Sequence, residues 1–325
     1  MSLIHKPHDK FFKETLSDLK TAQDFLQNYL PRELLEFMDL ETIALQKDSF
    51  IEKELEETFS DLLFQTKINH KDGYLYLLFE HKSYPSPKIA LQLLKYMLNI
   101  WEQKTTDQPT AKLPVIIPLV VYHGKARWNS PVKFSGLIED YDQLPLAVAS
   151  CLPDFSYLLY NISHYSNADI KGSVKLQIFL KLLRDIFEQD YTVFLKTLEE
   201  SIMAFNQLEN QGNGPEYFET FIRYIMNARN DLEFRTVYEL AKEISLERSE
   251  VVMTIAEKLI TEGMEKGMEK GMEKGMEKGI EKGIEKGMEK GKLEVAENLL
   301  RLGMGIDMII KATGLSEEEI RKIMN

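Results

Sequence analysis

The N-terminal third of the chain alternates between helix-like and strand-like patterns of apolar residues. Residues 8–30 place apolar side chains at helical spacing and stop at Pro31, so they predict a helix. Residues 58–68 and 74–82 have the composition of strands, and the turn-forming residues 69–73 between them predict a hairpin. The apolar positions on the predicted helix are Phe11, Phe12, Leu16, Leu19, Phe25, Leu26 and Tyr29.

A second helix and a third strand follow the hairpin. Residues 88–103 form an amphipathic pattern that predicts a helix, and residues 113–122 (LPVIIPLVVY) have the continuous apolar character of a buried strand. Residues 34–45 are ambiguous. The order helix, strand, strand, helix, strand predicts an α/β fold in which helices pack against a mixed sheet.

The rest of the chain has a helical pattern, rich in Leu, Ile and Phe over residues 173–198 and continuing over residues 217–262. A low-complexity repeat and a short tail follow it. These changes of pattern predict an α/β domain with a helical extension, then a helical segment that ends in the repeat, then a small helical tail. Their ranges are 1–235, 236–292 and 293–325.

The repeat, residues 263–291, consists of Gly, Met or Ile, Glu and Lys with a period of four. On a helix, each repeat advances about 400°, so the Met/Ile stripe drifts by about 40°. Each glycine costs a helix about 1 kcal/mol relative to alanine, although small residues at this spacing also permit close helix packing. The repeat is therefore either a solvated, partly helical spacer or a self-association helix that makes a homo-oligomer through the C-terminal region.

The tail (AENLLRLGMGIDMIIKATGLSEEEIRKIMN) resembles small helix-turn-helix units. Its last helix begins with a capping-box signal at Ser316 and Glu319. However, Glu317, Glu318 and Glu319 would meet phosphates unfavourably if that helix entered a DNA groove. A protein-contact role and a DNA-reading role both stay open.

Composition narrows the protein class. Apolar residues make up 44% of the chain, enough for a sizeable core. The single cysteine, Cys151, excludes an internal disulfide and suits a reducing cytosol. The N-terminus lacks an apolar signal core and no apolar run is long enough to span a bilayer, so we expect a cytoplasmic protein without a membrane partner. The net charge of −12 counts against general coating of nucleic acid, so a DNA-binding version needs local basic patches.

A phosphodiesterase chemistry is suggested by three residues of the predicted hairpin. Glu80 and Lys82 project from the same side of one strand, because successive strand residues alternate between faces. Asp61 on the neighbouring strand can come within reach of them. Two converging carboxylates suit Mg²⁺, and the lysine can position a water or stabilise developing charge. The alternative is a solvated pair at a strand end, which the apolar run before Glu80 makes less favourable.

Six segments of the chain carry a family resemblance: HDKFFKETLSD (8–18), FLQNYLP (25–31), FSDLLFQTK (59–67), LLFEHKS (77–83), QLLKYMLNIWE (92–102) and LPVIIPLVVYHGKARW (113–128). In them the chain resembles the bacterial recombination-promoting nucleases, which are also described as transposases of the PD-(D/E)XK superfamily. The resemblance covers about the first 130 residues in the family's order. Relatives often have Glu-His-Gln where this chain has Glu80-His81-Lys82, and the lysine favours an intact site.

The resemblance implies a PD-(D/E)XK restriction-endonuclease-like core and roles for individual residues. Asp61 and Glu80 would bind the metal, Mg²⁺ or Mn²⁺, and the backbone carbonyl of His81 would add a ligand. Lys82 would serve the water, and Gln92 would help orient the site. Asp9 matches the superfamily's helical acid only weakly, since three other acids compete for that position: Glu54, Glu56 and Glu57. His123, after the buried strand, could face the cleft, but is expected to be a turn residue.

Two functions from different classes follow. The first is a Mg²⁺-dependent DNA endonuclease that promotes recombination. The second is a catalytically silent DNA-binding or scaffold protein that keeps the nuclease fold, and a transposase-associated protein is a further alternative. The Glu-x-Lys triplet favours the first, whereas the acidic charge favours the second.

Overall fold

The computed structural model describes residues 6–46, 60–80, 86–106, 112–209 and 214–324. The chain divides into two compact units, residues 1–256 and 257–325. The first unit contains a mixed sheet with helices, and the second is helical.

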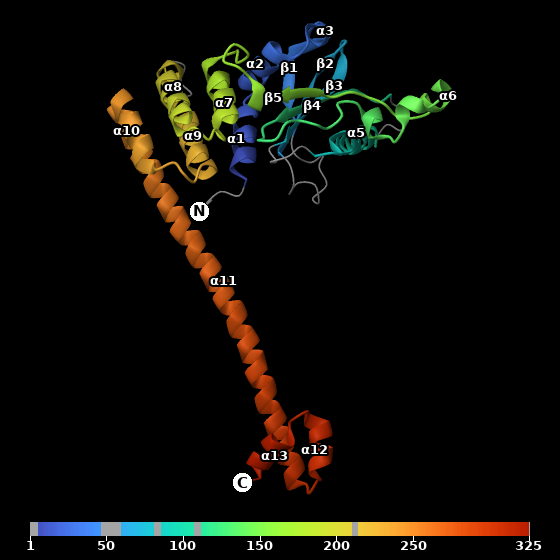
Figure 1. Ribbon diagram of the computed structural model, residues 1–325, viewed down its shortest axis with the longest axis vertical. Helices are drawn as coiled ribbons and strands as arrows, with labels where there is room; N and C mark the ends of the chain where they lie inside the picture. The colour runs from blue at the N-terminus through green and yellow to red at the C-terminus, as the bar shows by residue number, and fades with distance from the viewer. Residues whose placement is uncertain (1–5, 47–59, 81–85, 107–111, 210–213, 325) are drawn as a thin grey trace. The chain divides into compact units, whose positions relative to one another are not determined.

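A five-stranded sheet forms the centre of the first unit, in the order β1-β2-β3-β4-β5 (Figure 1). The first three strands are antiparallel, whereas β4 and β5 run parallel to β3. This confirms the predicted mixed α/β fold with a mainly helical C-terminal region. The strands are β1 (Met38–Leu45), β2 (Ser60–Ile68), β3 (Lys71–Glu80), β4 (Val115–Tyr122) and β5 (Leu158–Asn161).

The predicted hairpin is present, but its turn is shorter than expected. Only Asn69 and His70 separate β2 from β3, and both have positive φ, 49° and 61°. Two left-handed residues reverse the chain with the twist that a two-residue hairpin needs. Lys71 and the next two residues, expected in the turn, therefore pair with β2.

The predicted helix over residues 8–30 is wrong in its continuity, because two helices occupy this range. They are α1 (Pro7–Leu16) and α2 (Leu19–Tyr29). Asp18 separates them, and its carboxylate accepts hydrogen bonds from the Lys20 amide at 3.2 Å and the Thr21 hydroxyl at 2.9 Å. Such an N-cap starts a new helix rather than continuing the old one. The ambiguous segment that follows forms the short α3 (Arg32–Leu35) and then β1.

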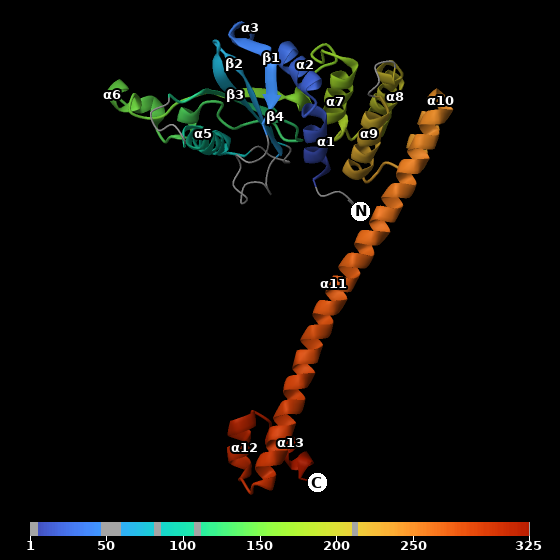
Figure 2. The same ribbon diagram turned by 180° about the vertical axis from the view of Figure 1, so that it is seen from behind.

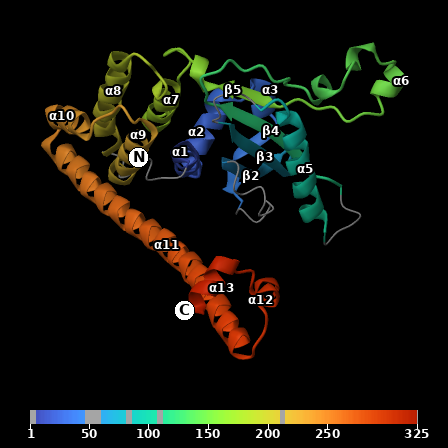
Figure 3. The same cartoon turned by 60° about the horizontal axis from the view of Figure 1, so that its bottom comes forward.

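Helices cover both faces of the sheet (Figure 3). On one face, Tyr96 of α5 (Ile89–Thr105) packs against Tyr76 of β3, with ring centroids 4.9 Å apart. On the opposite face, Phe25 of α2 meets Tyr160 of β5 at 5.3 Å. Residues 129–157 include η1 (Phe134–Leu137), η2 (Tyr141–Gln143) and α6 (Leu146–Ala149), and η3 (Ile162–His164) follows β5.

A helical extension follows the sheet within the same compact unit (Figure 2). Tyr224 of the extension stacks on Phe11 of α1, with centroids 4.1 Å apart and rings 6° from parallel. The extension is therefore packed against the helix that covers the sheet. Its helices are α7 (Val174–Asp185), α8 (Tyr191–Glu209), α9 (Gly214–Ala228) and α10 (Phe234–Ile244).

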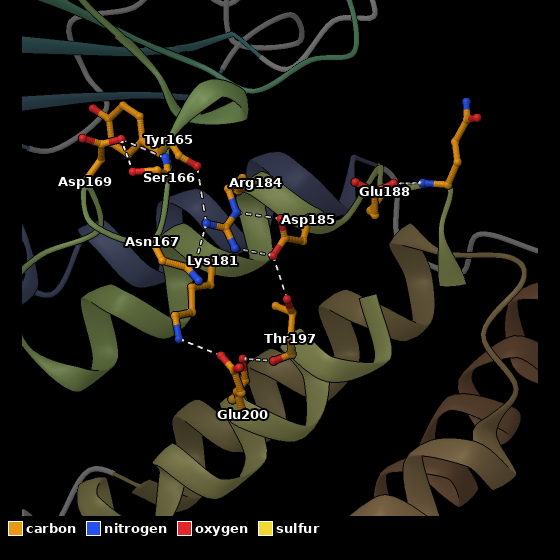
Figure 4. A network of polar contacts seen from close by, with 12 residues as sticks. Tyr165, Ser166, Asn167, Asp169, Lys181, Arg184, Asp185, Glu188, Thr197 and Glu200 are labelled. Atoms are coloured by element: carbon orange, nitrogen blue, oxygen red, sulfur yellow. Dashed lines mark hydrogen bonds and ion pairs between the residues drawn. The ribbon is translucent and has the colours of Figure 1, made fainter. Parts of the chain in front are cut away.

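Figure 4 shows the polar network that joins α7 to α8. Two guanidinium nitrogens of Arg184 donate to the two carboxylate oxygens of Asp185, each at 2.7 Å. The hydroxyl of Thr197 donates to the same carboxylate at 2.7 Å, and Arg184 also reaches Asn167 at 2.7 Å. The Asp185 residue is only 6% exposed, so these bonds compensate the cost of burying its charge.

The second unit has its own small core. The buried residues of α12 (Ile306–Thr313) and α13 (Glu317–Ile323) pack with the end of α11 (Leu246–Arg301), which contains the whole repeat. The predicted capping box is present, since Ser316 and Glu319 exchange hydrogen bonds. None of the helices in the described ranges combines the length and the apolar character needed to cross a membrane.

Candidate functional site

Positions 61 and 80 lie at the same end of the hairpin. Asp61, in the second position of β2, pairs with Leu78, and Glu80 ends β3 two residues later. Residues two apart share a face of a sheet, so positions 61, 78 and 80 belong to one face. Diagonal neighbours of this kind lie about 7–8 Å apart. The register therefore brings the two acidic positions together.

The remaining members of the predicted triplet lie outside the described residues. These are His81 and Lys82, and the same holds for the three competing acids: Glu54, Glu56 and Glu57. Their roles stay predictions.

Parallel strands end together beside Glu80. Glu80 pairs with Tyr122 of β4, and Tyr122 pairs with Asn161 of β5. The carboxamide oxygen of Asn161 is buried and accepts no hydrogen bond within the described part of the chain. The sheet thus offers a polar acceptor two strands away from position 80. The sequence alone did not indicate Asn161, because this residue belongs to no recognisable motif.

Gln92 lies near the start of α5, the helix that covers the face shared by positions 61 and 80. Its neighbours Ala90 and Leu93 are fully buried in the core beneath α5. The amide nitrogen of Gln92 is buried without a hydrogen bond among the described residues. A buried donor of this kind normally has a partner, and the role of Gln92 in orienting the site stays a prediction.

Asp9 lies in the first turn of α1 and is 7% exposed. The helix packs against β2, the strand that carries Asp61. A carboxylate buried to this degree is retained where donors or a cation stabilise it. The assignment of Asp9 as the helical acid remains a prediction.

His123 is not the turn residue expected from the sequence. It directly follows β4, is fully buried and stacks on the ring of Phe187 at 4.7 Å. Tyr122 is the last residue of β4, and the ring contact with Phe187 places His123 beneath the helical extension. The sequence concealed this position because the covering residue, Phe187, follows α7, more than sixty residues later in the chain.

The acidic residues at this end of the hairpin can be compared with the ligands that a hard cation prefers. Asp61 and Glu80 are acidic residues from adjacent strands whose positions share one face. Carboxylate and carbonyl oxygens are the ligands that Mg²⁺ and Mn²⁺ prefer. Among the fully described side chains, no group of three or more His, Cys, Asp or Glu residues could hold a metal ion. The residue types at the hairpin end are those that suit an oxygen-ligated divalent cation, and the cation itself stays a prediction.

Relatives of known name resemble the chain over most of its length. It is 27% identical to the recombination-promoting nuclease RpnA of Escherichia coli K12, over 97% of this chain and 96% of that protein. It is 28% identical to the inactive recombination-promoting nuclease-like protein RpnE of the same strain, over 81% of this chain and 84% of RpnE. With RpnD of Escherichia coli O157:H7, also named a recombination-promoting nuclease, the identity is 26% over 78% of this chain and 94% of RpnD.

No solved structure matches the chain significantly. Two family models do match it. The model described as "Putative transposase, YhgA-like" matches residues 6–213, and the C-terminal helix-turn-helix model of the Rpn/YhgA-like nuclease family matches residues 289–325. The first match covers well over half of the chain, so the protein belongs to the YhgA-like transposase family and carries the C-terminal helix-turn-helix domain of the Rpn/YhgA-like nucleases.

Proposed function

We propose that the protein is a Mg²⁺-dependent DNA endonuclease that hydrolyses phosphodiester bonds and promotes recombination. The observation that carries this proposal is the register of the hairpin, which brings the acidic positions Asp61 and Glu80 to one face. The names of its relatives as recombination-promoting nucleases support it.

Each residue of the site would have a separate task. Asp61, Glu80 and the backbone carbonyl of His81 would hold the cation by oxygen atoms. When bound, Mg²⁺ would polarise the scissile phosphate and lower the pKa of a water. Lys82 would hold that water with its ammonium and stabilise the charge that develops on the phosphate. Gln92 would donate its buried amide N–H to a group in the site.

A plasmid-nicking assay in Mg²⁺ and in EDTA tests the proposal. We expect wild-type nicking only with the metal, and a loss of about a hundredfold or more in Glu80→Gln and in Lys82→Ala, the scale of removing one preorganised charge. Matched controls are Glu41→Gln on β1 and Lys71→Ala at the other end of β3, both exposed. Wild-type rates in either site variant would remove the assignment.

A catalytically silent DNA-binding protein is the second candidate. The C-terminal helix-turn-helix match favours it, as does the name of RpnE, which calls that relative inactive. In that case DNA binding would persist while nicking would be absent in every metal. Both candidates take DNA as the partner and would act in the cytoplasm. A homo-oligomer through the C-terminal helical region stays a prediction for either.

A further inference from the structure

Two histidines from distant elements meet at the end of the sheet that carries the candidate site. His8 comes from the first turn of α1, and His123 follows β4. The Nε2 atom of His123 lies 3.3 Å from Nδ1 of His8, and the ring centroids are 5.1 Å apart. One polar contact therefore ties α1 to the carboxyl end of β4.

The helical extension closes this cluster. The hydroxyl of Tyr224 on α9 lies 2.9 Å from Nδ1 of His8. Phe187, just after α7, stacks on His123 and also meets the ring of His8 at 5.2 Å. Burial raises the pKa of Tyr224 well above its usual value, so the hydroxyl keeps its proton. Residues of the extension thus contact both histidines.

The two histidines are chain neighbours of the site. His8 precedes Asp9, and His123 follows Tyr122, which pairs with Glu80. Apolar side chains of the same volume could pack in several arrangements. Buried polar groups specify a single arrangement, because their hydrogen bonds require a particular geometry. The contact between the imidazoles therefore sets the spacing between the first turn of α1 and the ends of β3 and β4.

We propose that His8, His123 and Tyr224 are positioning residues that hold Asp9 against this end of the sheet, so that the helical extension sets the cation affinity of the site. The inference rests on the proposed function, because it takes Asp9 as a third carboxylate toward the cation. It assigns the extension a role in the site rather than in packing alone.

Tyr217 provides a matched control for Tyr224. Both lie on α9, both are buried, and both rings stack on Phe11. The Tyr217 hydroxyl also faces α1, 3.4 Å from Thr15, two turns away from His8. Either substitution by phenylalanine removes a single buried hydroxyl at the same interface, but only one of them touches the histidine pair.

Calorimetric titration of Mn²⁺ into the full-length protein tests the proposal. We expect about tenfold weaker affinity in Tyr224→Phe, the lower end of the loss that follows when the residues behind a metal ligand are disturbed. Tyr217→Phe should bind Mn²⁺ like the wild type. Metal-free unfolding midpoints of the two variants should agree, which separates positioning from stability. Equal Mn²⁺ affinity in the two variants would overturn the proposal.

Two further measurements sharpen the result. His123→Phe keeps the stack on Phe187 but removes the nitrogen contact, so it should weaken Mn²⁺ binding as Tyr224→Phe does. If Tyr224 acts through Asp9, combining Tyr224→Phe with Asp9→Asn should cost no more than Asp9→Asn alone, whereas additive losses would contradict the proposal. Wild-type protein that binds Mn²⁺ without nicking DNA would sink only the endonuclease proposal, whereas protein that binds no Mn²⁺ would sink both.

Discussion

At the scale of single residues, Asp61 decides the proposed chemistry. Two acidic residues at one site repel each other, so a divalent cation should be needed to keep both ionised. We expect Asp61→Asn to weaken Mn²⁺ binding and to cut nicking. Its DNA affinity in EDTA should stay intact or improve, because one negative charge is lost. Calorimetry and a DNA-binding titration measure the two effects separately.

The outcome for Asp61 is informative in both directions. Equal Mn²⁺ affinity in wild type and variant would show that Asp61 is not a ligand, and Glu80 and Lys82 alone would be too little to sustain a nuclease. Asp39→Asn on the exposed part of β1 is a suitable control, since it removes the same charge from the same sheet.

Asp18 makes a prediction about pH. Burial alone would raise the pKa of Asp18, but the ion pair with Lys175 at 2.6 Å and hydrogen bonds from Thr21 and Lys20 lower it below 3.8. A lowered folded pKa means that the ion pair stabilises the fold above about pH 4, and that this contribution is lost as pH falls through the folded pKa.

Asp18→Asn keeps the N-cap but removes the charge. We expect it to lower the free energy of unfolding by roughly 1 kcal/mol at pH 7 and to have a smaller effect at pH 3, where the charge is partly lost. Urea unfolding of the full chain at the two pH values measures the difference. An equal loss at both would show that the charge on Asp18 contributes nothing.

At the scale of elements, the sequence predicted what local pattern controls. The hairpin, α5 and β4 were predicted within a few residues, because each has an unbroken apolar period and turn residues on at least one side. The break at Asp18 was missed, since an apolar face continues across it. The burial of His123 depends on contacts with Phe187 and His8, which only tertiary packing brings near, so no local pattern could reveal it.

The repeat within α11 allows a test of helix propensity without packing. Added Cβ atoms at Gly267, Gly271 and Gly275 would meet nothing within 4 Å. Each glycine-to-alanine change should stabilise the helix by about 1 kcal/mol. The triple variant should therefore slow amide hydrogen exchange in α11 by roughly a hundredfold if these terms add.

The control for the repeat is a glycine whose backbone conformation does not tolerate alanine. Gly314 ends α12 at φ +69°, where alanine is strained. Gly314→Ala should speed amide exchange in α12 while leaving the repeat within α11 unchanged. If the triple variant left exchange in α11 at its wild-type rate, the repeat would not be an ordinary solvated helix, and close helix packing through the glycines would become the better explanation.

At the scale of the whole molecule, a net charge of −12 must be reconciled with DNA as the proposed partner. Longer-range repulsion is screened within about 8 Å at physiological salt, so local contacts decide binding. In the segment that matches the helix-turn-helix model, the basic side chains of α13 form ion pairs within their own helix. Arg321 pairs with Glu317 at 2.6 Å, and Lys322 pairs with Glu318 at 3.4 Å.

The double variant Glu317→Gln, Glu318→Gln tests whether α13 meets DNA. It removes two charges near the helix start and frees Arg321 and Lys322 to neutralise phosphates. If α13 contacts DNA, affinity should rise and the salt dependence should steepen by roughly two phosphate contacts. The same charge change at two exposed positions of the repeat, Glu265→Gln and Glu269→Gln, is the control.

The comparison separates local contact from net charge. Filter binding of a short duplex over a range of salt concentrations gives both affinity and slope for the two double variants. A larger gain and a steeper slope in the α13 variant alone would place α13 at the phosphates. If both variants gained equally with unchanged slopes, only the net charge of the protein would affect DNA affinity. The acidic first turn of α13 would then lie against no phosphate, and the helix-turn-helix domain would contact a protein surface instead.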